Sequence, residues 1–220
     1  MIKNAFPSVL TDREYLQAEL KEEGTLHLEK AFLTDDEKIE NISQHFAAIM
    51  ETLGLDLNDD SLKDTPNRVA KMFVKEIFSG LNPENKPSIS LFDNVYKYSE
   101  MLIEKDITLY SYCEHHFVPI IGKAHVAYIP NGKVIGLSKI NRLVQYYSKR
   151  PQVQERLTHD IAEGLKEALH TQDVAVRIDA IHLCVASRGI EDTKSSTTTV
   201  VYSGKFQEEK VRSEFNSLLR

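Results

Sequence analysis

The chain of 220 residues contains only two cysteines, and each lies close to histidine. Cys113 begins the sequence CEHH at residues 113–116, and Cys184 follows His182 after one intervening residue. Thiolate and imidazole groups are ligands of zinc, and a Cys-x-x-His spacing lets two side chains reach one ion from a single turn. Cys113, one of the adjacent histidines and Cys184 therefore predict a zinc site with three protein ligands. Such a site keeps one position open for water, as hydrolytic centres do and structural zinc sites do not.

The spacing leaves several alternatives open at this site. Either His115 or His116 can be the ligand, and the other histidine then stays free for acid/base work. Glu114 can complete the zinc shell or orient a ligand from outside it. Buried unreactive cysteines, or a disulfide between Cys113 and Cys184, are the non-catalytic alternatives. The disulfide is disfavoured because nothing in the chain indicates a secreted protein.

Two further groups have residue types suited to chemistry near the predicted metal. The segment 174–185 predicts one long strand, in which His182 and Cys184 point to the same side. A histidine held beside a metal ligand is suited to proton transfer near neutral pH, whereas an isolated one is more often a hydrogen-bonded core residue. Glu155 could accept two parallel hydrogen bonds from the N1–H and 2-amino group of guanine, or simply favour a helix start.

A cationic cluster is predicted at a helix N-terminus. Lys139 and Arg142 are three residues apart, and the backbone amides of such a terminus favour an anion. Arg188, just after the Cys184 segment, adds a third cation, and the three together suit a polyphosphate. The alternative is a solvated helix face without a ligand.

Helices are predicted in the first half of the chain. Thr34 to Glu37 has the form of a capping box, followed by apolar residues at helical spacing until Gly54. A second helix is predicted after Asp64-Thr65-Pro66, where an N-cap residue precedes proline at the first helical position, with an apolar stripe up to Gly80. Residues 81–100 are predicted to be a loop.

The second half mixes strands and helices. Strands are predicted at 107–112, 124–129, 133–136, 174–185 and 197–202, with Asn131-Gly132 as a hairpin turn between the second and third. Ser138 is expected to cap a short helix, Pro151 to start another, and 207–219 to form a closing helix. The pattern of hairpin, helix pair and hairpin predicts an α+β fold.

Composition narrows the class of protein. With 41% apolar and 27% charged residues, the chain can form one globular domain with an appended helical arm. A net charge of −6 argues against a nucleic-acid-binding surface. No apolar run approaches membrane-spanning length and no leader pattern is present, so a soluble, cytoplasmic protein is expected, without a nucleic-acid or membrane partner.

Five segments of the chain resemble signature segments of the GTP cyclohydrolase I family. They are DTPNRVAKM at 64–72, CEHHF at 113–117, VIGLSKINR at 134–142, RPQVQERL at 150–157 and RGI at 188–190. They follow the family's order, and the resemblance covers about residue 36 to the C-terminus. The first 35 residues do not match the family, and Ser187 stands where the family often has an apolar residue.

The resemblance implies Zn²⁺ at Cys113, His116 and Cys184, with His115 and His182 as the catalytic pair. It also implies that Glu155 binds guanine and that most of the other substrate-binding residues bind the ribose and triphosphate. The full set of substrate-binding residues that it implies is Glu155, Gln154, Ser138, Lys139, Arg142, Arg188 and Arg68.

The same resemblance implies the tunnelling fold, in which hairpin strands of several subunits close one β-barrel with helices outside. The expected assembly is a homodecamer with active sites between subunits. The expected division is an N-terminal arm at 1–35, a helical part at 36–100 and a catalytic tunnelling-fold domain at 101–220.

The reaction implied by the resemblance converts GTP and water to 7,8-dihydroneopterin triphosphate and formate, the first step of tetrahydrofolate and pterin biosynthesis. Two other functions are considered. A nitrile reductase of deazapurine metabolism has a related fold but uses a cysteine nucleophile and a nicotinamide cofactor. A zinc-stabilised assembly or binding module would have four protein ligands and no open position.

Overall fold

The computed structural model describes residues 33–219, and the chain forms two compact units that divide between Lys75 and Glu76. Most of the predicted arm, residues 1–35, lies outside the described residues. The three-part division expected from the sequence stays a prediction. Each unit is described here by itself.

The first unit contains two helices that pack against each other, α3 (Asp35–Thr52) and α4 (Thr65–Met72). Both hydrogen bonds of the predicted capping box are present, because Thr34 caps the Glu37 N–H and Glu37 accepts from the Thr34 N–H. Asp64 is the N-cap of α4, so Pro66 is the second helical residue and not, as predicted, the first, and the Asp64 side chain makes no capping hydrogen bond. The helix does not continue to Gly80, because a π-helical turn, η1 (Phe73–Ile77), follows it.

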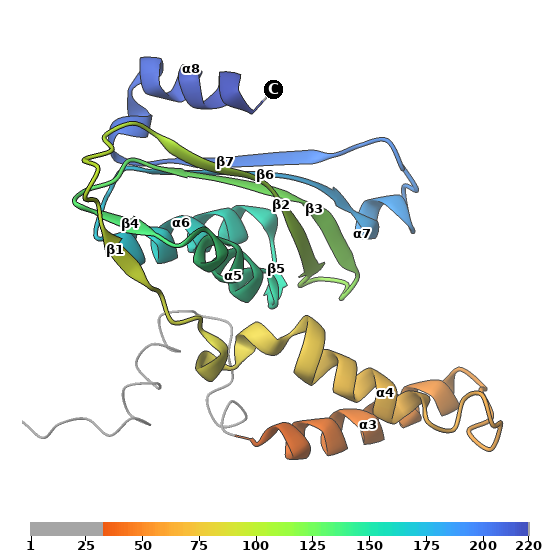
Figure 1. The fold of residues 1–220 in the computed structure, drawn as a ribbon. Helices are drawn as coiled ribbons and strands as arrows, with labels where there is room; N and C mark the ends of the chain where they lie inside the picture. Colours follow the sequence, from red (N-terminus) through yellow and green to blue (C-terminus); the bar gives the residue numbers. More distant parts are fainter. Residues whose placement is uncertain (1–32, 220) are drawn as a thin grey trace, which may run out of the picture. The chain divides into compact units, whose positions relative to one another are not determined.

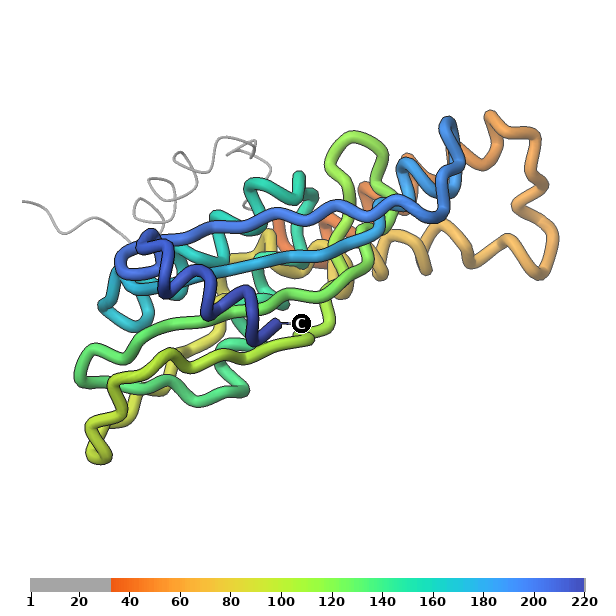
Figure 2. Tube along the Cα trace, turned by 90° about the horizontal axis from the view of Figure 1, so that it is seen from above, coloured from red at the N-terminus to blue at the C-terminus, as the bar shows by residue number. Residues whose placement is uncertain are grey.

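The second unit is built on a five-stranded sheet with the order β5-β2-β3-β6-β7. The strands are β2 (Leu102–Cys113), β3 (Pro119–Tyr128), β5 (Pro151–Gln152), β6 (Val174–His182) and β7 (Thr197–Tyr202). Neighbouring strands are antiparallel except β5, which runs parallel to β2. The four long strands run side by side in Figure 2.

Helices α5 (Leu137–Ser148) and α6 (Gln154–Leu169) cover one face of this sheet, and α8 (Glu209–Leu218) lies on the other (Figure 1). A 3-10 turn, η4 (Gly204–Gln207), leads into α8. The predicted order of hairpin, helix pair and hairpin is therefore confirmed, and the fold is α+β.

The main core lies between the sheet and the helix pair. Alternate residues of β2, such as Ile107 and Leu109, are buried on the helix side, where they join Leu157 and Ile161 of α6 in one cluster. Complete burial of each such side chain contributes roughly 1.5–3 kcal/mol. This packing fixes the sheet against α6, whose first turn lies at the end of the sheet where β2 ends.

The predicted hairpin at Asn131-Gly132 is wrong in its pairing. Gly132 makes a turn with φ of 75°, but β4 (Lys133–Ile135) pairs with β1 (Leu91–Asp93) in a separate two-stranded sheet. The reason is that β3 already has β2 on one side and β6 on the other, so no ladder position is left for β4. The predicted loop at 81–100 thus contains a strand, and two short 3-10 turns, η2 (Ser79–Leu81) and η3 (Pro83–Asn85), precede it.

Two predicted helix starts are also wrong. α5 begins at Leu137 after Gly136 as N-cap, so Ser138 lies inside the first turn and does not cap the helix. Pro151 does not start α6, because Pro151–Gln152 forms β5 beside the end of β2 and the helix begins at Gln154. Proline, which lacks an N–H, is tolerated at such a sheet edge. Within residues 33–219, no helix has the length and apolar character needed to cross a membrane.

Candidate active site

The sequence CEHH forms the turn that connects β2 to β3. The Cys113 N–H donates to the Val118 carbonyl at 2.9 Å, and the Phe117 N–H donates to the Cys113 carbonyl at 2.8 Å. Phe117 adopts φ of 55°, which is uncommon for a residue other than glycine and marks a tightly constrained turn. Residues 113–117, called the metal loop below, therefore have a defined backbone.

Three donor atoms converge at this end of the sheet. The ligand atoms of Cys113, His116 and Cys184 all lie within 4.8 Å of one another, and both cysteines are free thiols. Cys113 Sγ lies 3.8 Å from His116 Nδ1. Zn–S bonds of about 2.3 Å and Zn–N bonds of about 2.0 Å at tetrahedral angles place such atoms about 3.6 Å apart. The donor types and their spacing therefore fit a tetrahedral zinc ion.

The electrostatics of the two thiols favour a bound cation. Burial raises the pKa of Cys184, and the nearby Cys113 thiol raises it further. Two adjacent thiolates repel each other, so both are stable as anions only when a positive charge lies between them.

Cys184 reaches the site from a helical turn and not from a strand. The predicted strand 174–185 is wrong at its end, because β6 stops at His182 and α7 (Leu183–Ala186) follows. The last β3–β6 pair is Ile120 with His182, and β3 begins with Pro119, which has no N–H for a further ladder bond. His182 and Cys184 consequently do not share one strand face.

His115 lies beside the three-residue group but outside it. Its Nδ1 is 3.9 Å from Cys113 Sγ, its Nε2 is 3.6 Å from Glu114 Oε1, and its side chain is 64% exposed. Glu114 also lies outside the three-residue group. Its carboxylate pairs instead with the Arg156 guanidinium. This pairing favours a role for Glu114 in orienting a ligand from outside the zinc shell over a role as a zinc ligand.

Arg156 connects the metal loop to α6 and was missed in the sequence analysis. In addition to the Glu114 carboxylate, its guanidinium donates to Gln152 Oε1 at 2.9 Å and to the Pro151 carbonyl at 3.0 Å. The Glu114 N–H also donates to the Gln152 carbonyl at 3.0 Å. Gln152 lies in β5 and Arg156 in α6, and no sequence pattern connects Arg156 to Glu114.

His182 is held by the buried Gln154 side chain. His182 Nε2 lies 2.7 Å from Gln154 Oε1, and Gln154 is only 1% exposed. Burial lowers the pKa of His182, and the negative charge of Glu155 opposes this effect. His182 is therefore neutral over more of the pH range than a free histidine.

The predicted phosphate-binding residues do not all lie at the end of the sheet that carries the metal loop. On α5, Asn141 donates to Glu104 at 3.4 Å and Gln145 donates to the Thr108 carbonyl at 2.5 Å, so α5 runs along β2. Cys113 is nine residues beyond Glu104 on β2, or about 30 Å at 3.3 Å per residue. Ser138, Lys139 and Arg142 are thus separated from the metal group within one chain.

Three more predicted substrate residues, Glu155, Arg188 and Arg68, are exposed and lie in three places. Glu155 is in the first turn of α6, and Arg188 follows α7, close enough to lower the pKa of Cys184. Arg68 is on α4 in the first unit, where its guanidinium lies 3.4 Å from the Asp64 carboxylate. Glu155 and Arg188 therefore accompany the metal group in the second unit.

Comparison with known proteins identifies close relatives. The family model described as GTP cyclohydrolase I matches residues 42–220. GTP cyclohydrolase 1 of Flavobacterium johnsoniae is 64% identical over 188 residues, covering 85% of this chain and 84% of the relative. The enzymes of the same name from Aeromonas salmonicida and Yersinia enterocolitica are 55% and 54% identical, covering 83% and 88% of this chain and 84% and 88% of the relatives.

Proposed function

Because the chain belongs to the GTP cyclohydrolase I family, we propose that Cys113, His116 and Cys184 hold the zinc ion at which GTP is opened. The chain is a hydrolase that converts GTP and water to 7,8-dihydroneopterin triphosphate and formate, the first step of tetrahydrofolate biosynthesis. The observation that supports the metal assignment most directly is the convergence of two thiols and one imidazole from segments almost 70 residues apart.

Zinc, when bound, supplies a Lewis acid that lowers the pKa of a water molecule for attack at C8 of the purine. In our proposal His182 takes a proton from the attacking water and passes it to the purine ring nitrogen as the C–N bond of the five-membered ring breaks. His115 and His182 then move protons during ribose opening, the Amadori rearrangement and ring closure. The 3.9 Å distance between His115 Nδ1 and Cys113 Sγ, and the lowered pKa of His182, support these roles.

The substrate is recognised at two ends. Glu155 accepts hydrogen bonds from N1–H and the 2-amino group of guanine, which no adenine nucleotide offers together. The cations Arg188, Lys139, Arg142 and Arg68, with the Ser138 hydroxyl, bind the ribose and triphosphate. Contacts this far from the reacting atoms hold the changing skeleton in place through several chemical steps.

A site assembled between subunits follows from the separation within one chain. A GTP molecule cannot span the distance of about 30 Å from the metal group to the start of α5 in the same chain. The α5 cations of a neighbouring subunit can complete the site. This supports the expected homodecamer, as does β7, which has no partner strand on its outer side among the described residues. We further propose a cytoplasmic location, where thiols stay reduced for zinc binding.

The direct test combines metal analysis with a GTP assay on one preparation. Zinc-loaded protein should release formate from GTP and yield a fluorescent pterin after oxidation. If neither formate nor the pterin is formed, the proposal fails. His182→Ala should keep zinc but lose turnover, whereas Cys184→Ala should lose both. His159→Ala, on the exposed side of α6, is the matched histidine control and should retain both.

The two rival functions have distinct outcomes. A nitrile reductase would consume NADPH without zinc. A structural zinc module would show four protein ligands and no exchangeable ligand in X-ray absorption.

A further inference from the structure

We propose that Gln154 is a positioning residue for His182. Its buried amide fixes the histidine with a proton on Nε2, which leaves Nδ1 as the nitrogen that exchanges protons with the substrate. The inference rests on the catalytic role proposed above for His182. It differs from the substrate-binding role that the family resemblance implies for Gln154.

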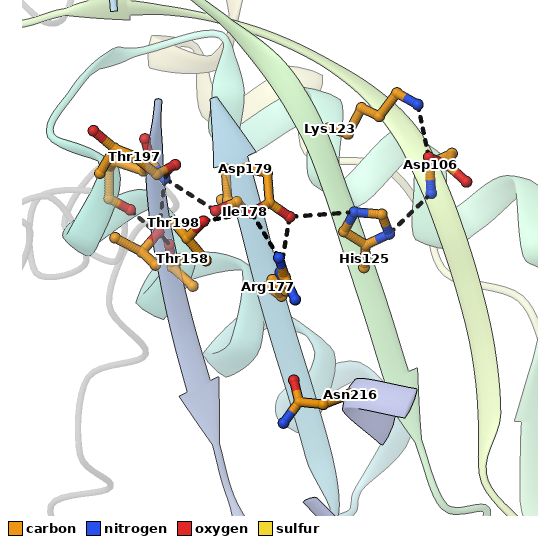
Figure 3. A network of polar contacts seen from close by, with 12 residues as sticks. Asp106, Lys123, His125, Thr158, Arg177, Ile178, Asp179, Thr197, Thr198 and Asn216 are labelled. Carbon is orange, nitrogen blue, oxygen red and sulfur yellow. Dashed lines mark hydrogen bonds and ion pairs between the residues drawn. The ribbon is translucent and has the colours of Figure 1, made fainter. Parts of the chain in front are cut away.

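Gln154 is the first residue of α6, and its side chain points into the contact between α6 and the strands β6 and β7. Its Nε2 lies 3.1 Å from the Ile178 carbonyl on β6, 3.0 Å from the Thr197 carbonyl and 3.1 Å from Thr199 Oγ1 on β7. Ile178 and Thr197 are labelled in Figure 3, together with Thr158 of α6. The amide is 1% exposed, so water cannot replace these partners.

These contacts determine which end of the amide is the nitrogen. Backbone carbonyls only accept hydrogen bonds, so the two that face Gln154 require its NH₂ group. If the amide were flipped, its oxygen would face both carbonyls, and these two acceptors and Thr199 Oγ1 would lose the donor that Gln154 provides. The carbonyl oxygen of Gln154 must therefore face His182.

The neighbouring threonines reinforce this orientation. Thr158 Oγ1 donates to the Gln154 backbone carbonyl at 2.6 Å, which uses its only hydrogen. Thr199 Oγ1, at 2.6 Å from Thr158 Oγ1, must then be the donor in that pair and the acceptor from Gln154 Nε2. The donor and acceptor roles in the cluster are therefore consistent, with the two hydrogens of the Gln154 NH₂ group shared among three acceptors.

The protonation pattern of His182 follows from this cluster. Gln154 Oε1 is an acceptor only and lies 2.7 Å from His182 Nε2, so Nε2 carries the proton. A neutral imidazole has one N–H, which makes Nδ1 the unprotonated nitrogen. Both ends of the Gln154 amide are thus occupied inside the chain, and its effect on GTP turnover passes through His182.

The decisive variant is Gln154→Met, which preserves size but removes the acceptor for Nε2–H. We expect kcat of the zinc-loaded enzyme to fall about 100-fold, near the lower contribution of general acid–base catalysis. The KM for GTP and the zinc content should stay within about twofold of the wild type, because no substrate or metal contact is removed. A raised KM with an unchanged kcat would instead show that Gln154 binds GTP, and would overturn the inference.

A double-mutant cycle tests whether the two residues act as a unit. In a His182→Ala background, Gln154→Met should reduce the residual kcat by less than about twofold. A further loss equal to that in the wild-type background would overturn the inference. If His182→Ala itself retained full turnover, the proposed role of His182 would fail first. If only Gln154→Met retained it, the inference alone would fail.

A structural control separates positioning from general destabilisation. Asn216→Leu on α8 removes another partly buried amide, which bonds Tyr202 Oη at 3.1 Å and the Arg212 carbonyl at 2.9 Å. It should lower the melting temperature but not kcat. An equal loss of kcat in both variants would contradict a specific effect of Gln154.

A measurement on the unmodified holoenzyme keeps the inference testable if Gln154→Met does not fold. Solid-state NMR of the enzyme with ¹⁵N-labelled histidine distinguishes the two tautomers by their ring-nitrogen shifts. The His182 signals, identified by their loss in His182→Ala, should show protonated Nε2. Protonated Nδ1 would exclude the proposed hydrogen bond.

Discussion

Arg156 provides the sharpest test of how the fold supports the metal loop. Its guanidinium bonds the Glu114 carboxylate inside the loop, and it also bonds Gln152 and the Pro151 carbonyl beside the loop. Arg156→Met removes all three interactions while keeping most of the aliphatic volume of the side chain. The loop then loses its connection to α6, although no zinc ligand has been changed.

The size of the effect can be worked out from these contacts. A charge-assisted hydrogen bond contributes about 1.5–3 kcal/mol when buried. The Arg156 and Glu114 side chains are 32% and 26% exposed, so solvent reduces this to about 1–2 kcal/mol. The two bonds to neutral acceptors contribute about 0.5 kcal/mol each. The total of about 2–3 kcal/mol corresponds to a loss of roughly 30- to 150-fold in zinc affinity, close to the typical effects of residues that orient metal ligands.

Zinc affinity should be measured by competition with a chromophoric chelator at constant pH. Lys166→Met is the matched control, because Lys166 lies on the same helix and pairs with Glu163, at 2.7 Å, away from the metal loop. Arg156→Lys, which keeps the charge but not the fork of donors, should lie between wild type and Arg156→Met. If Arg156→Met binds zinc within twofold of wild type while its melting temperature falls, Arg156 supports α6 alone and the reasoning is refuted.

Three further predictions concern the sheet and its core. Leu157→Ala should lower the free energy of unfolding by about 2–5 kcal/mol because Leu157 is fully buried. Leu53→Ala, at a 73% exposed position, should change the free energy of unfolding little. Equal effects of the two variants in denaturant titrations would contradict this prediction. Gly122→Ala should lower the free energy of unfolding by about 3 kcal/mol because a Cβ there would overlap the Asp179 carbonyl oxygen. Gly136→Ala should be tolerated, because the nearest atom to a Cβ at this position lies at 3.7 Å. Equal melting temperatures of the two variants would refute the close approach at Gly122. Burial lowers the pKa of His125 while Asp106 and Asp179 oppose it, so the unfolded chain takes up a proton first as the pH falls. The wild type should therefore lose stability below about pH 6.5, and His125→Gln should lose less in melts from pH 7.5 to 5.5, whereas identical slopes would exclude this linkage.

The His125 prediction has a structural basis on the face of the sheet opposite α5 and α6, where His125 is buried. His125 Nδ1 accepts the Asp106 N–H at 3.2 Å, at a bulge where Asp106 adopts φ of 59° (Figure 3). Its Nε2 lies 3.6 Å from Asp179, which also pairs with Arg177 at 2.8 Å. A proton on Nδ1 would remove the acceptor for the Asp106 N–H. The neutral form is therefore the one that fits the bulge.

The sequence predicted those elements that are encoded locally. The capping box at Thr34 and the apolar line of Leu157, Ile161 and Leu165 in α6 depend on residues within a few turns of each other, and all are present. The pairing of β4 was not predictable in this way. A turn signal at Asn131-Gly132 does not report that β3 already has two neighbours, because strand partners are chosen by long-range packing.

The candidate site shows the same limit. Cys113, the histidines and Cys184 could be named as metal ligands from their chemistry. The spacing did not show whether His115 or His116 is the ligand. Their distances to Cys113 Sγ, 3.9 and 3.8 Å, do not distinguish them. Only the position of Cys184 separates them, because it groups with His116. That position depends on where β6 ends, which the sequence analysis placed incorrectly.

The register of the sheet therefore serves the site as well as stability. Cys113 ends β2, and the β3–β6 ladder ends at the pair Ile120 and His182, so these two ladders bring both cysteines to one end of the sheet. A slip of one residue between β3 and β6 would shift Cys184 by about 3.3 Å and turn His182 to the other face. Zinc tolerates errors of only about 0.2 Å in its bond lengths. Gly122, which lets the β6 backbone approach closely, thus helps to fix the positions of the three donor atoms although it lies outside their group.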